Sequence, residues 1–194
     1  MIHSKEDLKE YLNADKEALS IIDRNKPGFG DLIWKYEISL RYCEFYNNVG
    51  GGFFSLMSRV YHKIRYKILG LLCGYEIPLN CIGKGLSIAH RGTIIINEAT
   101  KIGENCRIHV GVNIGTAPGC KNVAPQIGNN VYIAPGVKMY GSIKVASGII
   151  IGANAVVTKS FLEENICIAG VPAKKISNMG RLELEHRNMD MYNI

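Results

Sequence analysis

The sequence predicts a mainly β protein, a left-handed parallel β-helix preceded by an N-terminal α-helical region. Two observations carry this prediction. Aliphatic residues recur every six positions between Cys81 and Lys159, and Gly or Ala directly follows most of them. A period of six fits neither an α-helix nor a simple alternating strand, but it fits a solenoid whose short strands stack one coil apart. The recurring residues are Ile82, Ile88, Ile96, Ile102, Ile108, Ile114, Ile127, Ile133, Met139, Val145, Ile151 and Val157.

A second set of mostly small or aliphatic residues follows four positions after these. We expect both sets to point into the coil, while the Gly or Ala lets the chain turn a tight corner where a larger side chain would clash. A β-sandwich with coincidental spacing is the alternative, and the number of matching repeats favours the β-helix. The second set comprises Leu86, Thr100, Cys106, Val112, Val131, Val137, Ile143, Ile149 and Ala155.

Three helices are expected before the repeats. They run from Ser4 to Leu19, from Asp31 to about Tyr46 and from about Phe53 to Leu72, with Ser4 and Asp31 as N-caps. We therefore divide the chain into a helical region (1–77), a β-helix domain (78–176) and a polar C-terminal tail (177–194) with some helical propensity.

The third helix mixes basic and apolar residues, which leaves two interpretations. It could be an amphipathic helix at an anionic membrane surface, or a packed helix with a solvated basic face. The second interpretation is favoured, so its apolar residues are expected in the core. These are Phe53, Phe54, Leu56, Met57, Val60, Ile64, Ile68 and Leu71.

Composition limits the partners and the compartment. The net charge of +6 over 194 residues is too small to indicate nucleic-acid binding by itself. No run of about 18 apolar residues predicts a membrane span, and the polar N-terminus lacks the apolar core of a signal peptide. The six cysteines are scattered without metal-binding spacing, which indicates a reducing, cytoplasmic protein.

The six-residue period breaks twice. Ile88 and Ile96 are eight positions apart, and Ile114 and Ile127 are thirteen apart, so residues 116–125 are expected to leave the coil as a loop. Because insertions in solenoids collect on the binding face, both breaks indicate where the functional site lies.

Two histidines near these breaks are candidate catalytic residues. His90 occupies the first break, where an imidazole could accept a proton from a hydroxyl group; a structural hydrogen-bonding role is its alternative. His109 stands where Gly or Ala is usual, and an active-site role competes with that of a surface corner residue. Glu76 and Glu98 are the nearest carboxylates in sequence that could orient His90.

Four blocks of the repeat region resemble the serine acetyltransferase branch of the hexapeptide acyltransferases. They are Gly85–Gly103, Gly111–Thr116, Ile151–Val157 and Ala169–Lys174, and the resemblance covers roughly residues 78–176. It implies a homotrimer that uses acetyl-CoA without a metal, with active sites between subunits and His90 as the catalytic base. Backbone donors near Gly111–Gly115 are expected to stabilise the oxyanion.

The resemblance also implies a CoA site in the groove between neighbouring coils. Gly115, Ala134, Gly152 and Ala153 would line it, and Lys159, Lys174 and Lys175 would contact the CoA phosphates.

Several positions depart from that branch. Ala89 replaces the aspartate expected before the catalytic histidine, Val123 and Ala124 replace an Arg-His pair that binds serine, and Tyr75, next to Glu76, replaces the carboxylate that orients the histidine. Each missing charged hydrogen bond would cost ~1.5–3 kcal/mol of serine recognition. The pattern is more similar to acetyltransferases of this branch that modify sugars in capsular or other surface polysaccharide synthesis, and this resemblance implies a sugar hydroxyl as the acceptor.

Three alternatives remain. The chain could be a serine O-acetyltransferase of cysteine synthesis or a non-catalytic hexapeptide scaffold. A zinc-dependent carbonic anhydrase on the same fold is disfavoured, because it needs three histidine ligands and the repeat region supplies only His90 and His109.

Overall fold

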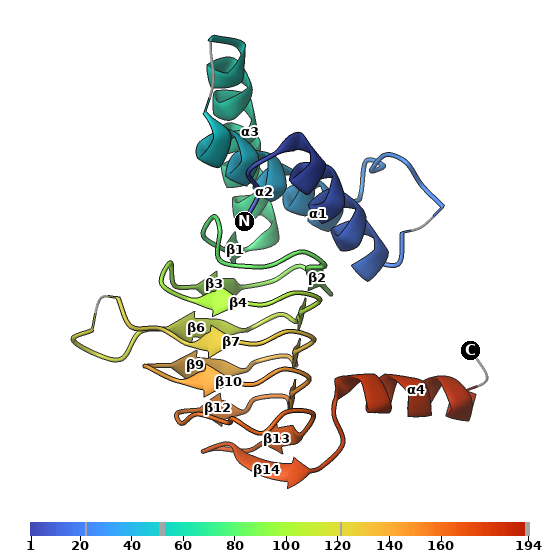
Figure 1. Cartoon of the computed structure of the whole chain (residues 1–194), viewed down its shortest axis with the longest axis vertical. Helices are drawn as coiled ribbons and strands as arrows, with labels where there is room; N and C mark the ends of the chain where they lie inside the picture. Colours follow the sequence, from blue (N-terminus) through green and yellow to red (C-terminus); the bar gives the residue numbers. More distant parts are fainter. Residues whose placement is uncertain (22, 51–52, 121, 193–194) are drawn as a thin grey trace.

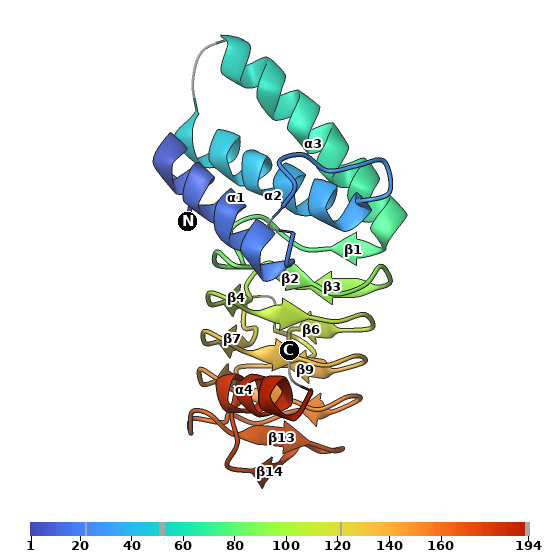
Figure 2. The ribbon, with the colours of Figure 1, turned by 90° about the vertical axis from the view of Figure 1, so that its right-hand side faces the viewer.

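Three helices stand on one end of a three-sided coil of short strands, and a fourth helix follows its other end (Figures 1 and 2). The computed structural model describes residues 1–21, 23–50, 53–120 and 122–192. The helices are α1 (Lys5–Ala18), α2 (Leu32–Val49), α3 (Phe53–Cys73) and α4 (Arg181–Tyr192). The predicted helical propensity of the tail is realised in α4.

The strands form three sheets, one for each side of the coil, and all pairs are parallel except β13 with β14. The first sheet contains β1 (Tyr75–Glu76), β3 (Ile94–Ile96), β6 (Asn113–Gly115), β9 (Lys138–Tyr140) and β12 (Val156–Val157). The second contains β4 (Lys101–Ile102), β7 (Gln126–Ile127) and β10 (Lys144–Val145). The third contains β2 (Ser87–Ile88), β5 (Arg107–Ile108), β8 (Tyr132–Ile133), β11 (Ile150–Ile151), β13 (Cys167–Ala169) and β14 (Lys174–Ser177).

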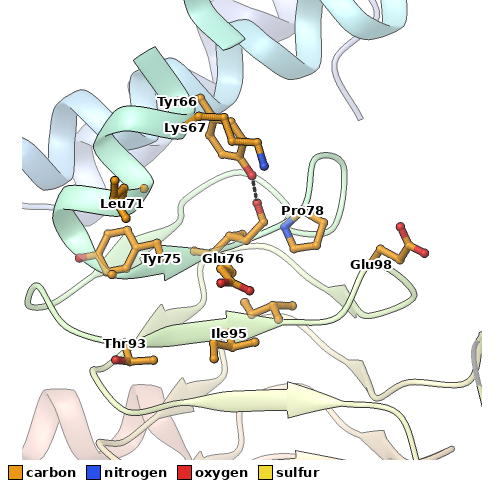
Figure 3. A pocket seen from close by; sticks show the side chains of 13 residues that line it. Tyr66, Lys67, Leu71, Tyr75, Glu76, Pro78, Thr93, Ile95 and Glu98 are labelled. Carbon is orange, nitrogen blue, oxygen red and sulfur yellow. Dashed lines mark hydrogen bonds between the residues drawn. The ribbon is translucent and has the colours of Figure 1, made fainter. Parts of the chain in front are cut away.

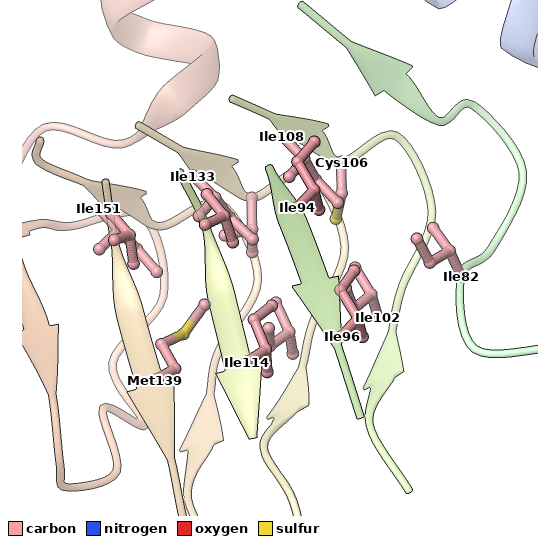
Figure 4. Packing of buried hydrophobic residues seen from close by; sticks show 14 of the residues in the cluster. Ile82, Ile94, Ile96, Ile102, Cys106, Ile108, Ile114, Ile133, Met139 and Ile151 are labelled. Carbon is pink, nitrogen blue, oxygen red and sulfur yellow. The ribbon is translucent and has the colours of Figure 1, made fainter. Parts of the chain in front are cut away.

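The core of the coil is a stack of aliphatic side chains (Figure 4). All twelve recurring residues are buried, with exposed fractions of 5% or less, and so is the second set. In the third sheet, Ile88, Ile108, Ile133, Ile151 and Ile168 lie in register on successive coils. The prediction that residues at the six-residue period point into the coil is therefore confirmed. Burial of each such side chain contributes ~1.5–3 kcal/mol.

The corners need small residues, as the period predicted. A Cβ atom added to Gly103 would lie 2.7 Å from the backbone of Gly128 on the next coil. Asn105 follows in the left-handed region, with φ of 54°, which asparagine tolerates better than most residues. Larger or β-branched residues at such positions would force neighbouring coils apart.

The two predicted N-caps behave differently. Ser4 caps α1 through a capping box, because its hydroxyl accepts from the Asp7 amide at 2.9 Å while the Asp7 carboxylate accepts from the Ser4 amide at 3.0 Å. Asp31 occupies the N-cap position of α2, as predicted, but its side chain makes no capping hydrogen bond. Its carboxylate instead accepts from Arg24 and from the Gly28 amide, both at 2.6 Å, and thereby fastens the preceding loop.

The core assignment for α3 is also wrong. Its helix boundaries match the prediction, and Leu69 and Cys73 are buried, but the apolar side chains predicted for the core are exposed where the structure describes them. The side chains of Phe53 and Phe54 lie outside the described residues, whereas the others are 48–85% exposed: Leu56, Met57, Val60, Ile64, Ile68 and Leu71. No helix in the described ranges is long and apolar enough to cross a membrane.

A buried ion cluster joins the helices to the first coil. Arg41 on α2 is fully buried and donates to Asp15 at 2.7 Å, to Glu44 at 3.0 Å and to the carbonyls of Ile82 and Gly83 at 2.9 and 2.6 Å. These contacts satisfy backbone carbonyls at the start of the coil that have no preceding coil to pair with.

The same helices satisfy two amides at the edge strand β2, one of them just before it. The Leu86 amide donates to Asp15 at 2.8 Å, and the Ile88 amide donates to Glu37 at 3.1 Å. Burial raises the pKa of Glu37 well above its ordinary value. The helical region therefore closes the sheet edge that would otherwise be open to pairing with another chain.

Replacement of Arg41 by alanine tests this junction. The change leaves Asp15 and Glu44 buried without their cation, so we expect the free energy of unfolding to fall by ~3–5 kcal/mol. Urea denaturation followed by circular dichroism measures the loss. Arg24→Ala is the matched control, because it removes an ion pair whose guanidinium is 50% exposed, and it should cost ~0–1 kcal/mol. Equal losses in the two variants would contradict the assignment.

Candidate active site

One corner of the coil brings the two candidate histidines together. This corner, where the chain passes from the third sheet to the first, is called here the His90 edge. The amides of Ala89, His109 and Ala134 donate to carbonyls one coil further on, at 3.1 Å each, and Gly152 does the same at 2.8 Å. Ala89, His109, Ala134 and Gly152 are therefore stacked along this edge, and His90 projects beside Ala89.

His90 and His109 differ in their environment. Their ring centroids are 6.2 Å apart, and the His90 side chain is exposed, whereas His109 is only 9% exposed. Burial, aided by Arg107 and His90, lowers the pKa of His109. Its Nε2 atom has no hydrogen-bond partner in the part of the chain that the structure describes. A neutral imidazole therefore lies beside the more accessible one.

Tyr75 holds the turn that carries His90. Its hydroxyl donates to the His90 backbone carbonyl at 3.0 Å. Burial raises the pKa of Tyr75, so the phenol stays protonated and keeps this bond. Tyr75 occupies the position where the resemblance expects a carboxylate. It positions the backbone of the turn rather than the imidazole, a role that the sequence alone did not suggest.

A pocket of about 320 Å³ opens directly beside His90. Its walls come from β2, from the turn after it, from the segment between α1 and α2 and from the first turn of α2, and they include Asp31, Trp34 and Arg91. Hydrogen bonds from Arg24 and Gly28 lower the pKa of Asp31, which keeps this carboxylate ionised. The pocket therefore combines an imidazole, a carboxylate and a guanidinium. Sequence reasoning missed Asp31 and Arg91, because only folding of the α1–α2 segment onto the coil places Asp31 there.

Neither predicted carboxylate partner reaches His90 within one chain. Glu76 and Glu98 line a different pocket, of about 620 Å³, between α3 and the first sheet (Figure 3). Glu76 lies on β1 opposite Ile95, and Glu98 follows β3 at the far end of that strand. Among the described residues, no hydrogen bond joins the His90 ring to either carboxylate. A catalytic role for Glu76 stays a prediction.

The predicted CoA-binding residues lie at two different edges. Ala134, Gly152 and Ala153 belong to the His90 edge. Gly115 and Lys159 lie at the opposite end of the first sheet, called here the loop edge, where residues 116–120 and 122–125 leave the coil (Figure 1). The predicted loop is present, and residue 121 lies outside the described residues. The two groups do not line one groove of a single chain.

The prediction of backbone oxyanion donors needs correction, and the prediction of lysine contacts with the CoA phosphates stays open. The amides of Gly111 and Asn113 already donate to Thr93 and Val137, at 2.7 and 3.0 Å, so they are not free to stabilise an oxyanion. Lys175 is paired with Glu163 at 2.6 Å. The side chain of Lys174 is exposed on β14, at the end of the coil remote from the helices, and its contact with a CoA phosphate stays a prediction.

Comparisons with known proteins bear on this geometry. Residues 124–159 match the family described as bacterial transferase hexapeptide (six repeats). A serine acetyltransferase from Staphylococcus epidermidis is 31% identical over 191 residues, which cover 95% of this chain and 84% of that protein. The chain belongs to the serine acetyltransferase family. The predicted superfamily and branch are therefore confirmed.

Solved structures of the family support the fold. The crystal structure of serine acetyltransferase in complex with coenzyme A from Brucella abortus has a TM-score of 0.69 and 23% identity, and the match covers 91% of this chain and 70% of that one. Soybean serine acetyltransferase apoenzyme has a TM-score of 0.68 and 21% identity, with 89% and 70% covered. The predicted left-handed β-helix with an N-terminal helical region is confirmed for this family member.

The lowered pKa of His109 predicts a pH-dependent stability. The folded protein keeps His109 neutral, whereas the unfolded chain takes up a proton near the ordinary pKa of about 6.5. The contribution of neutral His109 to the free energy of unfolding is therefore complete above a pH of about 6.5. This contribution is lost as the pH falls below that value toward the lower pKa of His109 in the folded protein.

We therefore expect His109→Leu to lose less unfolding free energy than the wild type between pH 8 and pH 5, roughly the range that spans this titration. Urea titrations across that range measure the difference. Buried acids such as Glu37 titrate in both proteins and cancel in the comparison. His186→Leu, at an exposed position of α4, should follow the wild type. Parallel decline in the wild type and His109→Leu would refute the assignment.

Proposed function

We propose that this chain transfers an acetyl group from acetyl-CoA to an acceptor hydroxyl, with His90 as the general base. Family membership supports the class, an acetyl-CoA-dependent acyltransferase. The observation that carries the residue assignment is the exposed imidazole of His90 at the break in the period, beside a pocket large enough for a small acceptor.

The proposed reaction needs one residue, His90, that accepts a proton and returns it. The His90 imidazole accepts the proton of the acceptor hydroxyl as its oxygen attacks the thioester carbonyl carbon. The tetrahedral intermediate collapses, the C–S bond breaks, and the CoA thiolate takes the proton back from the imidazolium. Tyr75 contributes by holding the backbone of the turn through the His90 carbonyl, and the adjacent His109 stays neutral and so adds no like charge when His90 is protonated.

Two copies of the chain are needed to complete the predicted CoA site. Along the His90 edge, Ala134, Gly152 and Ala153 are small residues that leave space for a pantetheine arm, and Ala153 is exposed there, although the amides of Ala134 and Gly152 already donate within the coil. Gly115 and Lys159 lie at the loop edge, so a neighbouring copy would have to present them. This division of the predicted residues between two edges supports the homotrimer with active sites between subunits that the resemblance implies.

L-Serine is the first candidate acceptor. The curated relatives are named serine acetyltransferase, and this name supports serine better than the saccharide predicted from the sequence. The pocket beside His90 supports it as well, because Asp31 could pair with the ammonium group and Arg91 with the carboxylate of an amino acid. These residues would replace the charged groups that are missing at Ala89 and at Val123–Ala124.

A saccharide hydroxyl is the second candidate, for a specific reason. Ala89, Val123 and Ala124 remove charged groups that the resemblance assigns to serine binding, and Trp34 places an aromatic ring in the wall of the pocket. The indole of tryptophan offers an apolar surface together with an N–H donor, which suits a sugar ring.

His90→Ala tests the shared chemistry. We expect the acceptor-dependent release of free thiol from acetyl-CoA to fall by about 10²–10⁴-fold, the usual contribution of a general base. His3→Ala, at an exposed residue near the N-terminus, should keep full activity. Thiol release that persists in His90→Ala would refute the base. CoA binding without turnover on L-serine and on a saccharide panel would favour the non-catalytic scaffold.

Arg91→Ala separates the two acceptors. If L-serine is the substrate, loss of one charged hydrogen bond at ~1.5–3 kcal/mol should raise KM for serine about tenfold to a hundredfold. A saccharide carries no carboxylate at this point, so its KM should change little. Arg187→Ala, at an exposed arginine on α4, controls for loss of a positive charge. An unchanged KM for serine would exclude Arg91 as the carboxylate partner.

A further inference from the structure

Helix α3 packs aromatic and histidine side chains inward, together with Leu69 and Cys73 near its end, and exposes most of its other apolar residues. His62 stacks on Tyr42 with ring centroids 4.3 Å apart, and Tyr66 stacks on Tyr36 at 5.6 Å. On the opposite side, Leu56, Val60, Ile64, Ile68 and Leu71 form a continuous exposed stripe, in which Leu71 is 85% exposed. Helices of globular proteins usually bury such a stripe, so this one requires a partner.

Positive charge borders the stripe on both sides. At 100° per residue, Arg59, Lys63 and Lys67 follow one border and Arg65 lies on the other. The helix sequence Phe53–Cys73 contains no aspartate or glutamate. In the described part of the chain, none of these four cations pairs with an acidic side chain.

The apolar surface continues beyond α3. A depression of about 740 Å³ beside the helix is lined by Ile68, Leu72, Arg65 and Lys35, together with Phe29 from the segment between α1 and α2. The Phe29 side chain is 99% exposed. An apolar stripe, an exposed aromatic ring and flanking cations thus lie together on the helical end of the molecule.

We propose that this face of α3 docks on an anionic lipid surface. The chemistry is that of an interfacial helix, in which leucine and isoleucine side chains enter the boundary of the acyl chains while arginine and lysine contact the phosphates. A two-fold contact between the α3 helices of two copies would bring the four cations of one copy close to the four of the other. This repulsion disfavours a second copy as the partner of this face. The inference does not depend on the acceptor or on His90.

Vesicle co-sedimentation of the full-length chain tests the proposal. We expect the wild type to sediment with vesicles of phosphatidylcholine and phosphatidylglycerol, to stay in solution with phosphatidylcholine alone, and to be released as salt is raised. The double variant Arg59→Glu/Lys63→Glu should bind the anionic vesicles at least about tenfold more weakly. Ile64→Ser/Ile68→Ser, which removes apolar contact without changing charge, should also bind more weakly.

The charge-matched control is Lys9→Glu/Lys144→Glu, at exposed positions on α1 and on the coil; it should bind like the wild type. Circular dichroism checks that each variant is folded, and light scattering gives its oligomeric state. Absence of wild-type binding, equal binding by the α3 variants, or equal weakening in the control would overturn the proposal. A smaller oligomer in the α3 variants would do so too, because it would assign the face to contact between copies.

Discussion

The contact between the Arg41 guanidinium and the first coil is the interaction on which the rest of the structure depends. A β-helix begins with strands that have no preceding coil, so its first carbonyls and amides lack partners. Arg41 donates to the carbonyls of Ile82 and Gly83, while Asp15 accepts from the amide just before β2 and Glu37 accepts from an amide of β2. The helices thus substitute for a missing coil, and the same docking brings the α1–α2 segment to His90. Stability at the junction and the shape of the candidate pocket have one origin.

The coil could be predicted from the sequence because its rule is local. A residue that points inward every six positions stays buried whichever partners it meets, and Ile108 or Ile133 needs no long-range information. The face of α3 could not be predicted in this way. The spacing of Ile64 and Ile68 shows that the helix is amphipathic, but packing on α2 decides which side is covered, and His62 and Tyr66 made those contacts instead. The interpretation of α3 as a packed helix with a solvated basic face was wrong for its core residues, because it assumed that apolar side chains are always buried.

The candidate site was predictable in part, for a related reason. The break at His90 identifies an edge, since an insertion displaces the corner where it occurs. Sequence distance from His90 does not identify partners, however, because a coil carries the chain away around three sides before it returns. Glu98 is near His90 in sequence but at the other end of β3, whereas Asp31 is far away in sequence and lines the same pocket. The breaks at His90 and at residues 116–125 lie on opposite edges, and one chain cannot join them.

Whether the acceptor is an amino acid or a sugar depends on where the ammonium and carboxylate charges of an amino acid would be neutralised. Burying an ammonium or a carboxylate without a partner costs more than any single contact returns, so serine selectivity requires charged groups in the pocket. Ala89 supplies none, but the Asp31 carboxylate retains acceptor capacity beyond its bonds to Arg24 and Gly28. Arg91 faces the same space. A saccharide would leave the Arg91 guanidinium without a counter-charge, whereas Asp31 keeps its ion pair with Arg24, and this penalty would disfavour a saccharide wherever Arg91 is desolvated. The degree of closure over Asp31 and Arg91, which a neighbouring copy would set, therefore determines how strongly this pocket distinguishes an amino acid from a sugar.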